Sequence, residues 1–344
     1  FPIVRASVDQ ELLTYQQRFF LNPEASKNHE RVDNWPVPLL PSIKLPNDLT
    51  SQPSYKTKIP ASSKPLMLNQ NHSGFYRTIY NPGHLEKLAK AVKSGQLSPL
   101  DRMGLLSDIT EAAKAGQAST IDALKLLEAY SNEDNSVVWD IIAGLLGSIR
   151  HVMNDELLRE NMKPFSRKLV AEQLARLGWK SKPNESHFDS LLRPLILSLA
   201  SFSEEPNVVN EALSRFEKMK TTEDLEPDLR GVIYGTAARK GHDKYFEKML
   251  KLHDSVNNSE ERVVLSSALT GFKNPALIDR ALAHINTDKV RLQDASYWIA
   301  YSFMNRHARD KTWDWMIKNW GWLEKNLGSD LSFYRFPVYA ARAY

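Results

Sequence analysis

The sequence predicts a mainly α-helical chain in which a small antiparallel β-sandwich precedes a long array of helices. Prolines and short alternating runs crowd the first part of the chain, up to about residue 82. From about Pro82 onward, apolar residues recur at helical spacing instead. The length of 344 residues also exceeds one ordinary compact core. We therefore expect a β-sandwich domain over residues 1–82 and a helical-repeat domain over residues 83–344.

Five short runs in the first domain are expected to be strands. They are Ile3–Val8, Leu12–Gln17, Trp35–Leu40, Tyr55–Ile59 and Tyr76–Tyr80. Strands this short, separated by turn residues, are typical of a small antiparallel sandwich. Prolines at positions 36, 38, 41, 46, 53, 60 and 65 cannot donate to a ladder, so they mark strand edges and turns.

The second domain carries apolar stripes that predict amphipathic helices. The clearest stripes lie within residues 137–149, 188–199 and 208–219. Ser98 and Pro99 form a helix start, and Gly95 and Gly116 stand where helices should end. Helices of this length, joined by brief loops, favour an irregular α-superhelix of stacked helix pairs, of the HEAT or armadillo kind.

The composition excludes several functional classes. The 45 basic and 41 acidic residues are distributed along the whole chain, which argues against a nucleic-acid partner. No stretch approaches the roughly 18 apolar residues that a membrane span needs, so we expect no membrane span. The chain has no cysteine, which removes thiolate and disulfide chemistry and favours a cytoplasmic location.

The residues give no pattern of a catalytic or metal site. None of the nine histidines has a second histidine three or four positions away, the spacing that lets one helix hold a metal. The nearest approach to H-E-x-x-H is His29-Glu30, where Asp33 replaces the second histidine. We therefore predict no catalytic residue, no metal ligand and no cofactor in this chain.

Four tryptophans lie close together near the end of the chain: Trp313, Trp315, Trp320 and Trp322. Trp313 and Trp320 are seven positions apart and are expected to share a helix face. Packing within the helical array is the main interpretation, because indoles bury much apolar area. An aromatic wall that binds peptide is the alternative.

Several segments together resemble one family, the gluzincin aminopeptidases, which include aminopeptidase N and the endoplasmic reticulum aminopeptidases. The segment NQNHSGFYRTIYN resembles that family's N-x-x-x-x-G-[FY]-Y-R-V-x-Y junction, and LSPLDRMGLLSDITEAAKAG is similar to its helix hairpin. The matching segments follow the family's order: Asn69–Asn81, Leu97–Gly116, Tyr130–Trp139, Leu177–Trp179, Leu191–Arg193, Ser259–Leu269, Arg291–Asp294 and Trp313–Trp320. Phe1–Val4 also resembles the strand that begins the family's sandwich.

The resemblance implies that the chain is the non-catalytic C-terminal part of a zinc aminopeptidase, which removes N-terminal residues from peptides. The family's H-E-x-x-H-x(18)-E and G-A-M-E-N motifs are absent, so the zinc is expected in a missing upstream catalytic domain of the same polypeptide. This chain would form the lid and wall of the substrate cavity, with peptide substrates as further partners. The family usually continues for another helix or two, so we expect the helical domain to be truncated at its C-terminal end.

The resemblance also implies one pair of substrate-binding residues, Arg335 and Tyr334. A guanidinium at this place can hold a peptide carboxylate or carbonyl. The alternative is a surface arginine whose stem packs on aromatic rings. The rival function is a free-standing helical-repeat scaffold for protein interaction, which has no reason to carry the Asn69–Asn81 junction.

Overall fold

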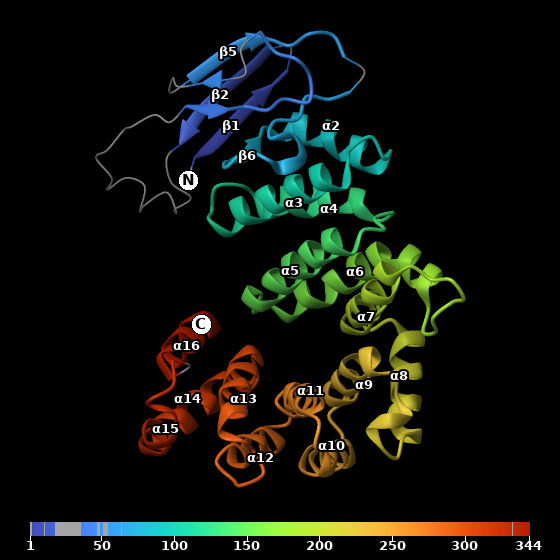
Figure 1. Cartoon of the computed structure of the whole chain (residues 1–344), viewed down its shortest axis with the longest axis vertical. Helices are drawn as coiled ribbons and strands as arrows, with labels where there is room; N and C mark the ends of the chain where they lie inside the picture. The colour runs from blue at the N-terminus through green and yellow to red at the C-terminus, as the bar shows by residue number, and fades with distance from the viewer. Residues whose placement is uncertain are drawn as a thin grey trace. The chain divides into compact units, whose positions relative to one another are not determined.

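The computed structural model describes residues 2–9, 11–17, 36–46, 49–50, 54–62, 64–331 and 333–344 (Figure 1). This part of the chain contains 15 α-helices and one small four-stranded sheet, which confirms the mainly α-helical prediction. None of its helices is both long enough and apolar enough to cross a bilayer.

Four of the strands lie close to predicted runs, whereas β3 covers only two residues of its run and β4 was not predicted. Their bounds are β1 Ile3–Val8, β2 Glu11–Gln17, β3 Val37–Pro38, β4 Leu49–Thr50, β5 Ser54–Lys58 and β6 Arg77–Tyr80. The main sheet has the order β5-β2-β1-β6, and β3 pairs with β4 in a second, two-stranded sheet. Trp35 of the predicted Trp35–Leu40 strand lies outside the described residues.

One pairing differs from the antiparallel expectation. Strand β1 pairs antiparallel with β2 but parallel with β6, where Ile3 lies opposite Arg77 and Ala6 opposite Tyr80. A hairpin turn enforces antiparallel pairing, whereas a strand that returns after a long connection is free to pair parallel. Strand β6 returns after such a connection, so local patterning could not give its direction.

The helices follow β6. Their bounds are α2 Pro82–Lys93, α3 Pro99–Lys114, α4 Thr120–Leu127, α5 Ser136–Val152, α6 Glu156–Leu177, α7 His187–Phe202, α8 Pro206–Lys218, α9 Pro227–Lys240, α10 Asp243–Ser255, α11 Ser259–Leu269, α12 Pro275–His284, α13 Leu292–Met304, α14 Arg309–Lys318, α15 Trp320–Leu327 and α16 Phe336–Ala343. The described residues also include four short 3-10 helices, of which the first precedes β6: η1 Gln70–His72, η2 Glu128–Tyr130, η3 Thr222–Asp224 and η4 Phe333–Arg335.

Three helix boundaries behave as the sequence predicts. The Ser98 side chain accepts a hydrogen bond from the backbone N–H of Asp101 at 3.1 Å and so caps α3, with Pro99 as the first helical residue. Gly95 and Gly116 follow the ends of α2 and α3 with φ of 70° and 68°, a conformation that glycine adopts without strain.

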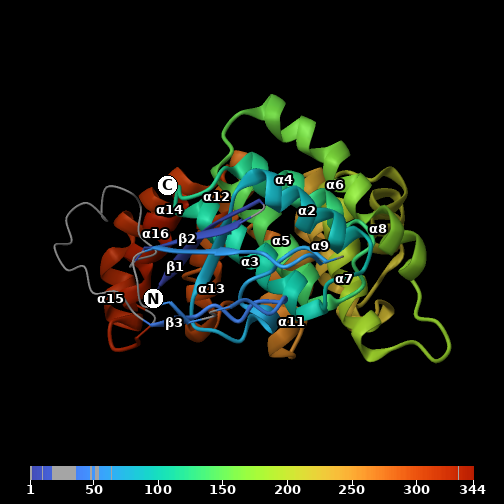
Figure 2. The same cartoon turned by 90° about the horizontal axis from the view of Figure 1, so that it is seen from above.

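The chain forms two compact units: residues 1–150 with 165–196, and residues 151–164 with 197–344. In the first unit, Figures 1 and 2 both show α3 next to the sheet. Ile3 of β1, Ile79 of β6 and Ala112 of α3 form one buried apolar cluster. Burial of these side chains joins the sheet to the first helices.

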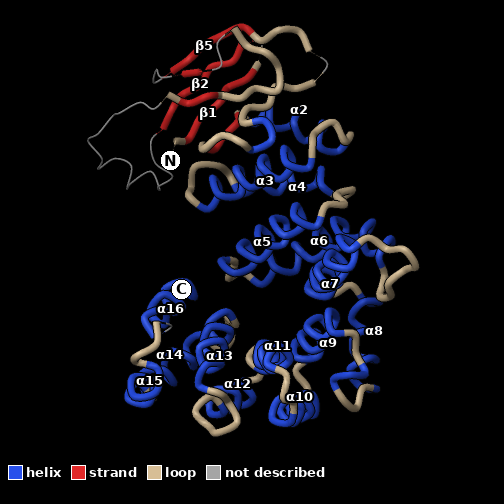
Figure 3. Tube along the Cα trace, viewed as in Figure 1, coloured by secondary structure: helices blue, strands red, loops and turns tan. Residues whose placement is uncertain are grey.

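The second unit is built from helices and loops in its described part (Figure 3). Helix α9 contacts α11, α11 contacts α13, and α13 contacts α16, while α8, α10, α12 and α14 each pack beside a member of that row. Trp298, Phe246 and Phe272 are fully buried between them. Each helix therefore buries its apolar stripe mainly against its sequence neighbours and the next pair along the chain.

Candidate functional site

Arg335 and Tyr334 lie on an exposed turn of the second unit, between α15 and α16. Both belong to η4, and Arg335 is the N-terminal flanking residue of α16. The neighbouring Phe333 holds this turn, since its ring centroid lies 5.1 Å from that of Trp320 and 5.8 Å from that of the buried Phe336. Tyr334 is 71% exposed, and within the described residues Arg335 forms no hydrogen bond or ion pair. The Arg335 side chain is therefore exposed and unpaired within the described residues.

Two of the four clustered tryptophans are less buried than the packing interpretation expects, whereas Trp315 and Trp322 are partly buried. Trp313 is 41% exposed and Trp320 is 37% exposed. They do not share a helix, because α14 ends at Lys318 and α15 begins at Trp320. The expectation of a common helix face was wrong, because the seven-residue spacing of the two tryptophans does not reveal that one helix ends and another begins between them. Ile317 of α14 and Val338 of α16 are also exposed.

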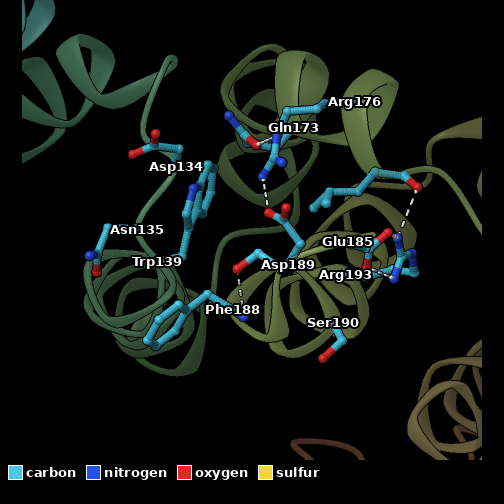
Figure 4. A network of polar contacts seen from close by, with 12 residues as sticks. Asp134, Asn135, Trp139, Gln173, Arg176, Glu185, Phe188, Asp189, Ser190 and Arg193 are labelled. Carbon is cyan, nitrogen blue, oxygen red and sulfur yellow. Dashed lines mark hydrogen bonds and ion pairs between the residues drawn. The ribbon is translucent and has the colours of Figure 1, made fainter. Parts of the chain in front are cut away.

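The segment around Arg193 of α7 is held by ion pairs within the first unit (Figure 4). The Arg193 guanidinium forms a bidentate pair with Glu185, and these side chains are 3% and 9% exposed. The Arg193 hydrogen bonds are the main cause that lowers the pKa of Glu185 to about 2. Arg176 of α6 pairs with Asp189 at 2.6 Å. Both ion pairs lie at the connection between α6 and α7, and the Arg193 guanidinium is buried there.

The acidic turn before Trp139 also serves to stabilise the fold. Glu133, whose side chain is 1% exposed, accepts two hydrogen bonds from the Arg102 guanidinium at 2.7 and 2.8 Å. The indole N–H of Trp139 donates to the Glu133 carbonyl at 2.7 Å, and the Tyr130 hydroxyl donates to the Arg102 carbonyl at 2.8 Å. This network joins the Leu97–Gly116 and Tyr130–Trp139 segments, so their motif residues are explained by folding.

The Asn69–Asn81 junction is a third buried polar network. The Asn69 side chain accepts from the backbone N–H of Gly74 at 2.6 Å and donates to the Tyr76 carbonyl at 2.9 Å. Asp108 of α3 accepts from the backbone N–H of Thr78 at 2.8 Å and from Arg77 at 3.0 Å. Burial raises the pKa of Asp108 to about 7, although both of these hydrogen bonds act in the opposite direction. The hydrogen bonds of Asp108 therefore hold β6 against α3.

The fold also brings together residues that the spacing of histidines along the sequence did not reveal. His253, Asp254 and His284 place one possible ligand atom each within 4.8 Å of one another. His253 and His284 come from α10 and α12, so no search within one helix could find the pair. His29, Glu30 and Asp33, the nearest approach to a zinc motif, lie outside the described residues.

Comparison with known families and proteins gives consistent matches. The family model of the ERAP1-like C-terminal domain matches residues 65–344. Aminopeptidase 2 of Candida albicans is 28% identical over 96% of this chain and 37% of its own length. Aminopeptidase N of Lactobacillus helveticus is 27% identical over 98% of this chain and 40% of its own length. Glutamyl aminopeptidase of Bitis rhinoceros is 27% identical over 93% of this chain and 35% of its own length. The chain therefore spans about two fifths of these relatives or less.

Proposed function

Because this chain belongs to the family of ERAP1-like C-terminal domains, we propose that it is the non-catalytic C-terminal region of a zinc aminopeptidase that removes N-terminal residues from peptides. The observation that carries the proposal is the joint match: aminopeptidases align over almost the whole chain, yet only over a minor share of their own length. The zinc and the catalytic glutamate belong to the remaining part of such an enzyme.

The match also favours an enzyme region over a free-standing repeat scaffold. The alignment with the Candida albicans relative covers 96% of this chain, so it includes residues of the sheet as well as the helices. The junction at Asn69 and the Asp108 network join sheet and helices through buried hydrogen bonds. A scaffold that presents only helical repeats would not require this arrangement. The lack of cysteine further favours a reducing compartment, so we extend the proposal to a cytoplasmic enzyme.

Within the enzyme, this region is proposed to form the lid and part of the wall of the substrate cavity and to hold the far end of the peptide. The exposed turn with Arg335 supports this role, because a guanidinium with no partner among the described residues can donate two parallel hydrogen bonds to a carboxylate. Tyr334 beside it offers a hydroxyl and an exposed ring. The half-exposed Trp313 and Trp320 supply apolar surface for the rest of the peptide.

The test uses the full-length enzyme with Arg335→Ala. One charge-assisted contact contributes about 1.5 kcal/mol, which is roughly a tenfold change in kcat/KM. We expect that loss for peptides and no change for single-residue chromogenic substrates, which do not reach a distant turn. Arg335→Lys keeps the positive charge but not the two parallel N–H donors, so it should retain part of the wild-type kcat/KM for peptides.

Lys318→Ala removes an exposed cation from the neighbouring α14 and serves as the matched control. Equal losses on peptides and single-residue substrates for Arg335→Ala would reject a peptide-holding role for the turn.

The non-catalytic role is tested separately on the chain alone, which should release no aminoacyl fluorophore in the presence of zinc. Clear turnover by the isolated chain would reject the non-catalytic role.

A further inference from the structure

The ends of α10 and α12 bring two imidazoles and one carboxylate into contact. His253 Nδ1 and His284 Nε2 both lie 3.0 Å from Asp254 Oδ1. The three atoms that could bind a metal are all within 4.8 Å of one another. In the described part of the chain, no other group of three such side chains has this geometry.

The two rings are held in place by apolar packing. His253 is 1% exposed and His284 is 11% exposed at the side chain, whereas Asp254 is 28% exposed. The Trp298 ring of α13 lies 5.2 Å from the His253 ring and 5.6 Å from the His284 ring, measured between centroids. Both imidazoles are therefore held with one nitrogen facing the carboxylate. Because the Asp254 carboxylate is partly exposed, an ion could reach the cluster from solvent. Ligands that are already oriented bind a metal with little loss of side-chain freedom.

The local charges favour a cation on balance. His253 lies in the last turn of α10 and His284 is the last residue of α12, so the negative ends of two helix dipoles point toward the cluster. The Asp254 carboxylate adds a full negative charge when ionised. The positive charge of Arg262 acts on His253 in the opposite sense, but its guanidinium donates to the carbonyls of Val256 and Lys289.

We infer that His253, Asp254 and His284 form a zinc site that links the C-terminal ends of α10 and α12. Imidazole nitrogens and a carboxylate oxygen are ligands that zinc accepts, whereas calcium and magnesium require mostly oxygen ligands. Bond lengths of about 2.0 to 2.1 Å place the ligands of a tetrahedral ion about 3.4 Å apart. The observed separations of 3.0 Å, with all three atoms within 4.8 Å, need only a small adjustment.

A fourth ligand would be water, as in other zinc sites with three protein ligands. The indole N–H of the fully buried Trp298 has no hydrogen-bond partner among the described residues and lies in the ring that packs on both histidines. The inference does not depend on the proposed function, because the site is built entirely from this chain and lies apart from any H-E-x-x-H motif.

The experiment measures binding of Zn²⁺ by calorimetry and of Co²⁺ by visible absorption to the chelator-treated chain. One ion per chain and the strong absorption of four-coordinate Co²⁺ are expected. His284→Asn and Asp254→Asn should each weaken binding at least about tenfold, as loss of groups in a metal site does. His187→Asn, an exposed histidine at the start of α7, is the matched control and should bind as the wild type does.

Circular dichroism establishes that each variant is folded, and zinc should raise the Tm of the wild type and of His187→Asn but not of the other two variants. If the wild type binds neither ion more tightly than His284→Asn does, the inference is wrong. Binding that is equal in all four proteins would place the ion elsewhere and would equally overturn it.

Discussion

Replacing Arg102 by methionine removes one partner of a buried ion pair while it keeps much of the side-chain volume. The carboxylate of Glu133 would lose two charge-assisted hydrogen bonds and would keep only the backbone N–H groups of Asp134 and Asn135, at 3.2 and 2.9 Å. The Glu133 side chain is 1% exposed, so water cannot replace the lost partner. An uncompensated buried charge of this kind costs about 3 to 5 kcal/mol of unfolding free energy.

A double-mutant cycle with Glu133→Gln tests this reasoning. Because both single variants break the same contact, the double variant should lose less than their sum, by about 1 to 3 kcal/mol. Lys114→Met is the matched control on the same helix, since its pair with Glu111 is exposed at 45% and 36% and should contribute under about 0.5 kcal/mol. Urea denaturation gives the free energies, and amide exchange in α3 identifies the transition of the first unit. A loss below about 1 kcal/mol for Arg102→Met would refute the assigned role.

For two further perturbations the structure predicts the direction in which the free energy of unfolding changes. Burial raises the pKa of Asp108 from 3.8 to about 7, so the folded chain keeps a proton that the unfolded chain releases. Stability should therefore fall as pH rises from about 4 to 7, by at most about 1.4 kcal/mol per pH unit, and Asp108→Asn should flatten this dependence in urea denaturation. Identical pH profiles would contradict this. Gly104→Ala would place a Cβ 2.5 Å from Nδ1 of His72 and should cost about 1 to 3 kcal/mol. Gly144→Ala, with open space around it, should instead stabilise by up to about 1 kcal/mol, and similar effects at both glycines would contradict the proposed steric clash.

The proposal for Arg335 rests on both the sequence and the structure. The family-like order of segments placed this arginine near the end of the helical domain, but the sequence alone could not tell a free guanidinium from one that packs on aromatics. The structure shows that Phe333 contacts the rings of Trp320 and Phe336, and that the Arg335 side chain forms no hydrogen bond or ion pair within the described residues. What the guanidinium binds stays a prediction.

The sequence by itself determined the features that depend on neighbouring residues. The strand at Ile3–Val8, the cap of α3 at Ser98 and the helix ends before Gly95 and Gly116 all follow from local hydrogen bonding and backbone sterics. Apolar periodicity likewise predicted that the second part of the chain is helical, because an amphipathic helix buries one apolar stripe regardless of which element it packs against.

The tertiary structure alone decided which distant residues meet. The parallel pairing of β1 with β6, the contact of Asp108 with Thr78 and the cluster of His253 with His284 join positions that are about thirty or more residues apart. Such contacts depend on how the helices and strands pack, and residue spacing within one element carries no information about them. The absence of the zinc-protease motif could therefore be read from the sequence, whereas the cluster of His253, Asp254 and His284 became visible only when α10 and α12 came together.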